Sequence, residues 1–288
     1  MVKGSLAYWR KSLLNQLDPS PLPQTGDEEL DALVGSTAGD YSSALFEEDM
    51  QNIADEDLPR ADALIRKLAR QMATRLARRY RQSKKQQRLD LRKTIRHNIR
   101  FGGTLLKLRY RSRRKQKPRL VLLCDVSGSM ARYASFVIQF IYGINDVVSQ
   151  IESFIFSEDL ERVIDYFQHK DDFKLTMLEV INSSKEWSRC TNLGAALKSL
   201  RLNYPDLLSG HSILLIVSDT KTIELDETMQ ELAQLKRIVK DLILLNTLPH
   251  GDWQNSKSVR TLQGVLRMFP CKTLSDLEKV VRQKIITY

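Results

Sequence analysis

Two short runs of apolar residues, each leading into an aspartate, constrain the fold more than any other feature of the chain. Residues 119–124 read RLVLLC and precede Asp125, and residues 211–218 read HSILLIVS and precede Asp219. A strand without polar alternation is expected in the middle of a parallel sheet, where helices cover both faces. Both runs are therefore expected to be central strands of such a sheet.

Segments of helical length alternate with further strand-like segments along the same half of the chain. The apolar patterns predict helices over 133–148, 171–182, 192–202, 225–240 and 274–284, and shorter strands over 153–157, 162–167 and 242–245. Strands that alternate with helices of about 10–15 residues are typical of βαβ units. The predicted fold class is α/β: a doubly wound, mostly parallel, Rossmann-like sheet.

The composition divides the chain into three parts. Residues 1–57 are rich in Pro, Gly, Ser and acidic residues, which predicts a loosely ordered arm. Residues 58–117 form a basic helical module, since Leu64, Leu68, Met72 and Leu76 recur every four residues within a predicted helix over 58–83. The α/β domain is expected to occupy residues 118–288.

The positive charge of the chain is concentrated in the basic module. The whole protein carries a formal charge of +10, yet residues 60–119 hold about 23 Lys and Arg against two acids, Asp62 and Asp90. The remainder is therefore net acidic. A helix face that is solvated or paired within the molecule, an acidic protein partner, and nucleic acid all remain open as explanations of the basic stretch.

The sequence also indicates where such a chain works. Its three cysteines, Cys124, Cys190 and Cys271, are widely spaced, which argues against a disulfide framework or a zinc site and favours a reducing compartment. No run approaches the roughly 18 apolar residues of a membrane span, and the first residues lack the features of a secretory signal. We expect a cytoplasmic protein.

Polar residues that follow the two apolar runs are candidates for a metal site. The first run continues as Asp125-Val-Ser127-Gly-Ser129, the second ends at Asp219, and Thr191 stands just before a predicted helix. In open parallel sheets, ligands bind where loops leave the carboxyl ends of the strands. Oxygen ligands with few carboxylates suit Mg²⁺. The sequence therefore predicts a magnesium site, with Mn²⁺ or Ca²⁺ as alternatives, formed by Asp125, Ser127, Ser129, Thr191 and Asp219.

The predicted ligand set favours a binding role over catalysis. Neutral hydroxyl ligands leave most of the 2+ charge uncompensated, so the metal would attract an external anion such as an acidic side chain of a protein partner. We expect Asp125 and Asp219 to act through bound waters or by hydrogen-bonding the hydroxyl ligands.

These five residues carry a resemblance to a known family. In order and in predicted structural context, they resemble the metal-ion-dependent adhesion site (MIDAS) of von Willebrand A (VWA) domains, and the resemblance covers about residues 118–285. The stretch DLRKTIRHNIRFGGTLLKLRYRSRRKQKPRLVLLCDVSGSM is similar to the CoxE-like branch. That resemblance implies a cytoplasmic, non-enzymatic adaptor that works with a MoxR-type AAA+ ATPase in the maturation of a client enzyme or in the insertion of its metallocofactor.

The chain departs from this branch at two positions. CoxE-like proteins usually have Asp where this chain has Asn192, and Gly where it has Thr220. The Asn192 departure removes a carboxylate near the predicted metal, which predicts weaker or altered metal preference.

Three other interpretations compete with the adaptor. Ser127 or Ser129 could simply cap the helix that follows them. A metal-dependent hydrolase is a second alternative, although Ser127 lacks a Gly-x-Ser-x-Gly elbow and an evident His partner. The third is nucleic-acid binding through residues 60–119, where only Tyr80, Phe101 and Tyr110 supply aromatic side chains.

Overall fold

A six-stranded sheet forms the centre of the molecule. The computed structural model describes residues 44–54, 57, 60–61, 63–69, 88–89, 91–99, 107, 110–111, 119–130, 133–134, 136–140, 151–163, 166, 173–186 and 189–280. The sheet has the order β5-β4-β3-β6-β7-β8, and every pair is parallel except β4 with β5. Its strands are β3 (Arg119–Asp125), β4 (Ile151–Phe156), β5 (Leu160–Arg162), β6 (Ser212–Ser218), β7 (Asp241–Asn246) and β8 (Arg267–Pro270). The predicted α/β class with a mostly parallel sheet is confirmed.

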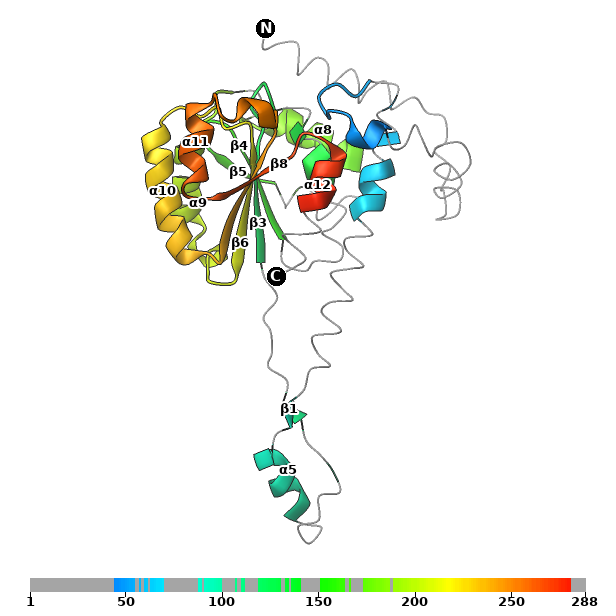
Figure 1. Ribbon diagram of the computed structural model, residues 1–288, viewed down its shortest axis with the longest axis vertical. Coiled ribbons are helices and arrows are strands. Elements are labelled where there is room, and N and C mark those ends of the chain that lie inside the picture. The colour runs from blue at the N-terminus through cyan, green and yellow to red at the C-terminus, as the bar shows by residue number, and fades with distance from the viewer. Residues whose placement is uncertain are drawn as a thin grey trace.

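Helices cover both faces of this sheet, which explains why its central strands are apolar throughout (Figure 1). On one face lie α9 (Leu193–Asn203), α10 (Leu225–Ile238) and α11 (Lys257–Gln263). On the other lie the helical residues 133–134 and 136–140, α8 (Phe173–Ser183) and α12 (Leu274–Val280). Side chains alternate between the two clusters along each strand: Leu122 and Cys124 of β3 face one, and Val121 and Leu123 the other.

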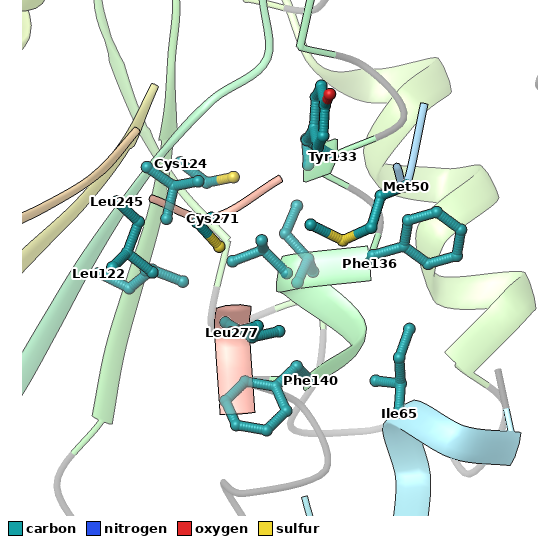
Figure 2. Close-up of a cluster of buried hydrophobic side chains, with 14 of the residues drawn as sticks. Met50, Ile65, Leu122, Cys124, Tyr133, Phe136, Phe140, Leu245, Cys271 and Leu277 are labelled. Carbon is teal, nitrogen blue, oxygen red and sulfur yellow. The ribbon is translucent and has the colours of Figure 1, made fainter. Parts of the chain in front are cut away.

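Parts of the chain that precede the sheet contribute to its core. Met50 and Ile53 are fully buried, as is Ile65 in the helical residues 63–69. Figure 2 shows Met50 and Ile65 in the same buried cluster as Phe136, Phe140 and Leu277. The division of the chain at residues 57 and 117 stays a prediction, but the described residues on either side of residue 57 share one core with the sheet.

A small unit lies apart from the sheet. It consists of β1 (Arg88–Leu89), α5 (Leu91–Asn98) and β2 (Tyr110–Arg111), and β1 pairs antiparallel with β2. Figure 1 shows β1 and α5 beyond the amino end of β3, at the far end of the long axis of the molecule. This unit belongs to the stretch predicted to be a basic helical module.

Some elements differ from the prediction. The strand predicted over 162–167 is observed as the three-residue edge strand β5 (Leu160–Arg162). The 3-10 segments η3 (Pro205–Leu207) and η4 (His250–Asp252), together with α11 and β8, were not predicted. Most of the predicted helix over 58–83 lies outside the described residues. Among the helices that the structure describes, none is both long and apolar enough to cross a membrane.

The buried position of Ile53 predicts that residues before the sheet stabilise the whole domain. Replacing a fully buried Ile by Ala removes apolar contacts and leaves a cavity, so Ile53→Ala should lower the free energy of unfolding by about 2–4 kcal/mol in urea denaturation. Leu202→Ala is the matched control, because Leu202 is 60% exposed and its loss should cost less than about 1 kcal/mol. Equal losses in the two variants would show that residues 44–54 are not part of the core.

Candidate metal site

The candidate residues meet at the carboxyl edge of the two central strands. Asp125 is the last residue of β3 and Asp219 directly follows β6, and these strands are parallel neighbours in the sheet. Their carboxyl ends therefore lie side by side. Thr191 lies in the loop before α9, and Asn192 N donates a hydrogen bond to Ser157 O beyond the end of β4, which fixes this loop at the same edge.

Asp125 is a buried carboxylate that is fully hydrogen-bonded. Its Oδ1 accepts from the backbone amide of Ser127 at 2.9 Å, and its Oδ2 accepts from Ser218 Oγ at 2.7 Å. Thr191 Oγ1 stands 3.4 Å from Oδ2. Burial raises the pKa of Asp125 to about 6, and the hydrogen bonds from Ser127 and Ser218 oppose that rise. The carboxylate thus connects the loops after β3 and β6 with the loop before α9.

The two serine hydroxyls and Asp219 complete the cluster. Ser127 Oγ lies 3.5 Å from Ser129 Oγ, which donates a hydrogen bond to Asp219 Oδ2 at 2.8 Å. The side chains of Ser127, Thr191 and Asp219 are largely buried. All five candidate residues are therefore brought together from three segments: the end of β3 with its loop, the loop before α9 and the loop after β6.

Two further residues at the site were missed by the sequence analysis. Ser218 donates to Asp125, and Thr220 N in turn donates to Ser218 Oγ at 3.0 Å. The ammonium group of Lys221 lies 3.1 Å from Asp219 Oδ2, on a side chain that is 66% exposed. A serine at the end of an apolar run has no distinctive sequence pattern. The contact of Lys221 with Asp219 depends on the conformation of the turn after β6.

The structure gives physical roles to the two departures noted in the sequence. Asn192 is the N-cap of α9, and its side-chain oxygen accepts from Ala195 N at 3.0 Å, a role that Asn and Asp fill equally well. Thr220 adopts a φ of 64°, a left-handed conformation that costs a β-branched residue about 1–2 kcal/mol and that glycine adopts freely. Strain of this kind persists only where the surrounding structure holds it, here beside Asp219.

Residues 49–51 contact the loop that follows β3 and the helical residues after that loop. Gln51 Nε2 lies 3.4 Å from the carbonyl oxygen of Ser129. Asp49 accepts a 2.6 Å hydrogen bond from the hydroxyl of Tyr133, which follows that loop, and forms a 2.9 Å ion pair with Lys272. Burial raises the pKa of Tyr133, and its hydrogen bond to Asp49 raises it further. The loop is thereby held against residues 49–51 and the turn before α12.

The chemistry of the donor set fits a small divalent ion. The hydroxyls of Ser127 and Ser129, both proposed as direct ligands, stand 3.5 Å apart, whereas adjacent ligands of an octahedral Mg²⁺ with bonds of 2.0–2.1 Å stand about 2.9 Å apart. Within the described ranges, no group of three or more His, Cys, Asp or Glu side chains is arranged to hold a metal. An ion here would depend on hydroxyl ligands, which suits Mg²⁺ better than the softer transition metals.

Comparisons with known proteins address the family and the fold separately. The family model described as "VWA domain containing CoxE-like protein" matches residues 62–280. No curated protein matches the chain.

Several solved structures are similar in fold. A von Willebrand factor type A protein from Catenulispora acidiphila is 10% identical, with a TM-score of 0.40, over 61% of this chain and 43% of that one. The proximal thread matrix protein 1 of the mussel byssus, with a zinc-occupied MIDAS motif, is 16% identical with a TM-score of 0.38 over 58% of this chain and 46% of its own. Manganese-loaded TRAP from Plasmodium vivax is 15% identical with a TM-score of 0.39 over 59% and 73%. The chain thus spans less than half the length of the first two.

The pKa of Asp125 predicts how the stability of the metal-free protein changes with pH. Its folded-state value of about 6 lies above the ordinary 3.8, so between these values the folded state keeps a proton that the unfolded state has lost. This carboxyl should therefore stabilise the fold less as pH rises through that range, by about 2 kcal/mol in total. The Asp125→Asn variant has no ionisable group at this position, so it should lack this part of the pH dependence. Urea denaturation in EDTA at pH 4.5 and pH 7 should show wild type losing that amount relative to the variant, and a constant difference would contradict the prediction.

Proposed function

The chain belongs to the family of VWA domain-containing CoxE-like proteins, and on that premise we propose that it is a non-enzymatic adaptor that binds a protein partner through a divalent metal. The observation that carries the proposal is the convergence of Asp125, Ser127, Ser129, Thr191 and Asp219 from three segments at one edge of the sheet. VWA domains that bind zinc or manganese, in the mussel and Plasmodium proteins, support a divalent ion here. We propose Mg²⁺, with Mn²⁺ and Ca²⁺ as alternatives.

The arrangement of the ligands supports a binding role for the metal. Ser127, Ser129 and Thr191 would offer neutral hydroxyl oxygens, while the Asp125 carboxylate already accepts hydrogen bonds on both of its oxygens. The bound ion would keep most of its positive charge and take an anionic ligand from outside, for which an acidic side chain of a partner is suited. Asp125 and Asp219 would orient the hydroxyls, as outer-shell carboxylates do in other metal sites.

Family membership supports the identity of the partners. We propose that a MoxR-type AAA+ ATPase and a client enzyme, which acquires its metallocofactor with their help, are the proteins that this adaptor brings together in the cytoplasm. Pull-downs from the native host in Mg²⁺ and in EDTA, with identification of what elutes, would name them. Retention of the same proteins in both buffers would place the contact elsewhere on the chain.

Removing the two serine hydroxyls tests the metal site directly. Ser127→Ala with Ser129→Ala deletes two of the proposed ligands, so the affinity for Mg²⁺ measured by isothermal titration calorimetry should fall at least about tenfold. Binding of any partner that is retained only in Mg²⁺ should fall with it.

Ser258→Ala with Thr261→Ala is the control for this pair, because it removes two hydroxyls from α11 and leaves the site intact. The control should bind Mg²⁺ as wild type does. Unchanged Mg²⁺ affinity in the Ser127/Ser129 variant would disprove the proposed ligands, and unchanged partner binding would disprove the metal-dependent adaptor.

Lys221 is expected to lower metal affinity. Its ammonium group lies 3.1 Å from Asp219 Oδ2, where its positive charge opposes the approach of a cation to the carboxylate. Exposed ion pairs contribute up to about 1 kcal/mol, so Lys221→Met should raise Mg²⁺ affinity roughly two- to fivefold. Lys236→Met on α10, where Lys236 donates to the carbonyl of Val265, should leave it unchanged. Weaker binding by the Lys221 variant would mean that this lysine assists the site.

A further inference from the structure

Exposed aliphatic side chains gather on the small unit that lies apart from the sheet. Among the described residues, the large apolar side chains that are well exposed include Leu89 (42%), Leu91 (60%), Ile95 (56%) and Ile99 (66%). The remaining ones, Leu202, Ile223 and Ile238, lie singly on the body. Scattered exposed apolar residues are ordinary, but a cluster on one short element indicates an interaction surface.

Three of these side chains lie on one face of α5 and the turn that follows it. Leu91, Ile95 and Ile99 are spaced four residues apart, so they follow one another along the helix and its last turn. We call Leu91, Ile95 and Ile99 the α5 ridge. Spacing of this kind is the pattern by which one helix enters an apolar groove of another protein.

The fold of the unit holds the α5 ridge outward. Asn98 is fully buried, and its side-chain amide donates to the carbonyls of Thr94 at 2.7 Å and Lys107 at 2.8 Å. The amide of Lys107 donates back to Asn98 Oδ1 at 3.0 Å. The buried face of α5, formed by Thr94 and Asn98, is thus fixed toward the following segment. The α5 ridge is already ordered on a folded helix. Binding a partner would therefore cost little conformational entropy of this segment.

Arginines line one edge of the α5 ridge. Arg92 and Arg96 each follow a ridge residue by one position and are exposed, so they form a second row about 100° around the helix. Within the part of the chain that the structure describes, neither forms an ion pair. The sequence from 88 to 111 has eight Lys and Arg against one acid, Asp90, so positive charge predominates in this stretch.

We propose that the α5 ridge docks into an apolar groove of a partner protein whose rim carries carboxylates opposite Arg92 and Arg96. Guanidinium groups recognise carboxylates through paired hydrogen bonds, and arginines beside buried aliphatic side chains are typical of interface hot spots. A nucleic acid would use the arginines but leave the aliphatic ridge in water. A bilayer surface favours cations on both flanks of an apolar face, whereas here Thr94 and Asn98, packed within the unit, occupy the other flank.

This surface is separate from the candidate metal site. The unit lies beyond the amino end of β3, whereas Asp125 and Asp219 lie at the carboxyl edge of the sheet (Figure 1). Docking at the α5 ridge is therefore independent of metal, and the proposal stands whether or not the metal-dependent adaptor does.

Site-specific photo-crosslinking in the native host tests the identity of the occupant. A photoreactive amino acid replaces Ile95 in the full-length chain, and Leu202, equally exposed on the body, is the control position. We expect the Ile95 probe, and not the Leu202 probe, to crosslink to one protein at residues that border a cluster of Asp or Glu. Crosslinks to lipid or nucleic acid, or none above the control, would overturn the proposal.

The partner identified by crosslinking is then purified, and its affinity for the full-length chain tests the apolar and charged contacts of the proposed interface. Ile95→Ser and Arg96→Glu should each weaken its binding to the full-length chain at least about tenfold, equally in Mg²⁺ and in EDTA. Replacing the facing carboxylate of the partner by Arg should restore binding to the Arg96→Glu variant, which loss of folding would not permit. The Ser127→Ala/Ser129→Ala variant should bind this partner normally. Unaltered affinity of both α5 variants, or no rescue by any facing charge reversal, would overturn the proposal.

Discussion

The buried carboxylate of Asp125 is the constraint on which the candidate site depends. A carboxylate removed from water is stable only when hydrogen bonds replace its hydration, and here a backbone amide of its own loop and the hydroxyl of Ser218 do so. One partner lies in the loop after β3 and the other is the last residue of β6, so satisfying this side chain fixes that loop against the end of β6. Burial still raises the pKa of Asp125 to about 6, so the hydrogen bonds offset only part of the cost of removing the carboxylate from water. A bound metal would compensate the remaining charge, which links the stability of this edge to its occupancy.

The support of the first loop comes from a segment outside the family match. That match begins at residue 62, whereas Asp49 and Gln51 contact Tyr133 and Ser129. Asp49 also pairs with Lys272 and forms a β-bridge with Thr273. One largely buried carboxylate thus joins the early chain, the helical residues after the loop and the turn before α12. The sheet supplies the edge at which the candidate residues meet, and residues 49–51 support the loop after β3 from outside the matched region.

The sequence allowed the central strands and the five candidate residues to be predicted because both depend on local pattern. A run such as LVLLC can be stable only where both of its faces are covered, and an aspartate at its end then lies at the ligand-binding edge of a parallel sheet. Edge elements carry weaker signals: β5 has three partly exposed residues, and β8 also has no fully buried residue. Ser218, Lys221 and Asp49 could not be predicted, because their partners are distant in sequence or depend on the turn after β6. Asn192 has a role that the sequence analysis missed, since its side chain caps α9, and its predicted effect on metal preference stays a prediction.

The two proposed binding surfaces should respond to different changes in solution: one to chelation of metal and the other to ionic strength. An ion held by hydroxyl ligands is removed by chelation and resists moderate salt, whereas arginines on an exposed helix are screened as ionic strength rises. The two surfaces lie at opposite ends of β3, so a partner at one does not cover the other (Figure 1). Contacts of modest affinity on one molecule reinforce each other when both engage the same assembly, since the second contact forms at a high effective concentration. An adaptor of this design would hold an assembly that contacts both surfaces more tightly than a partner that contacts either surface alone.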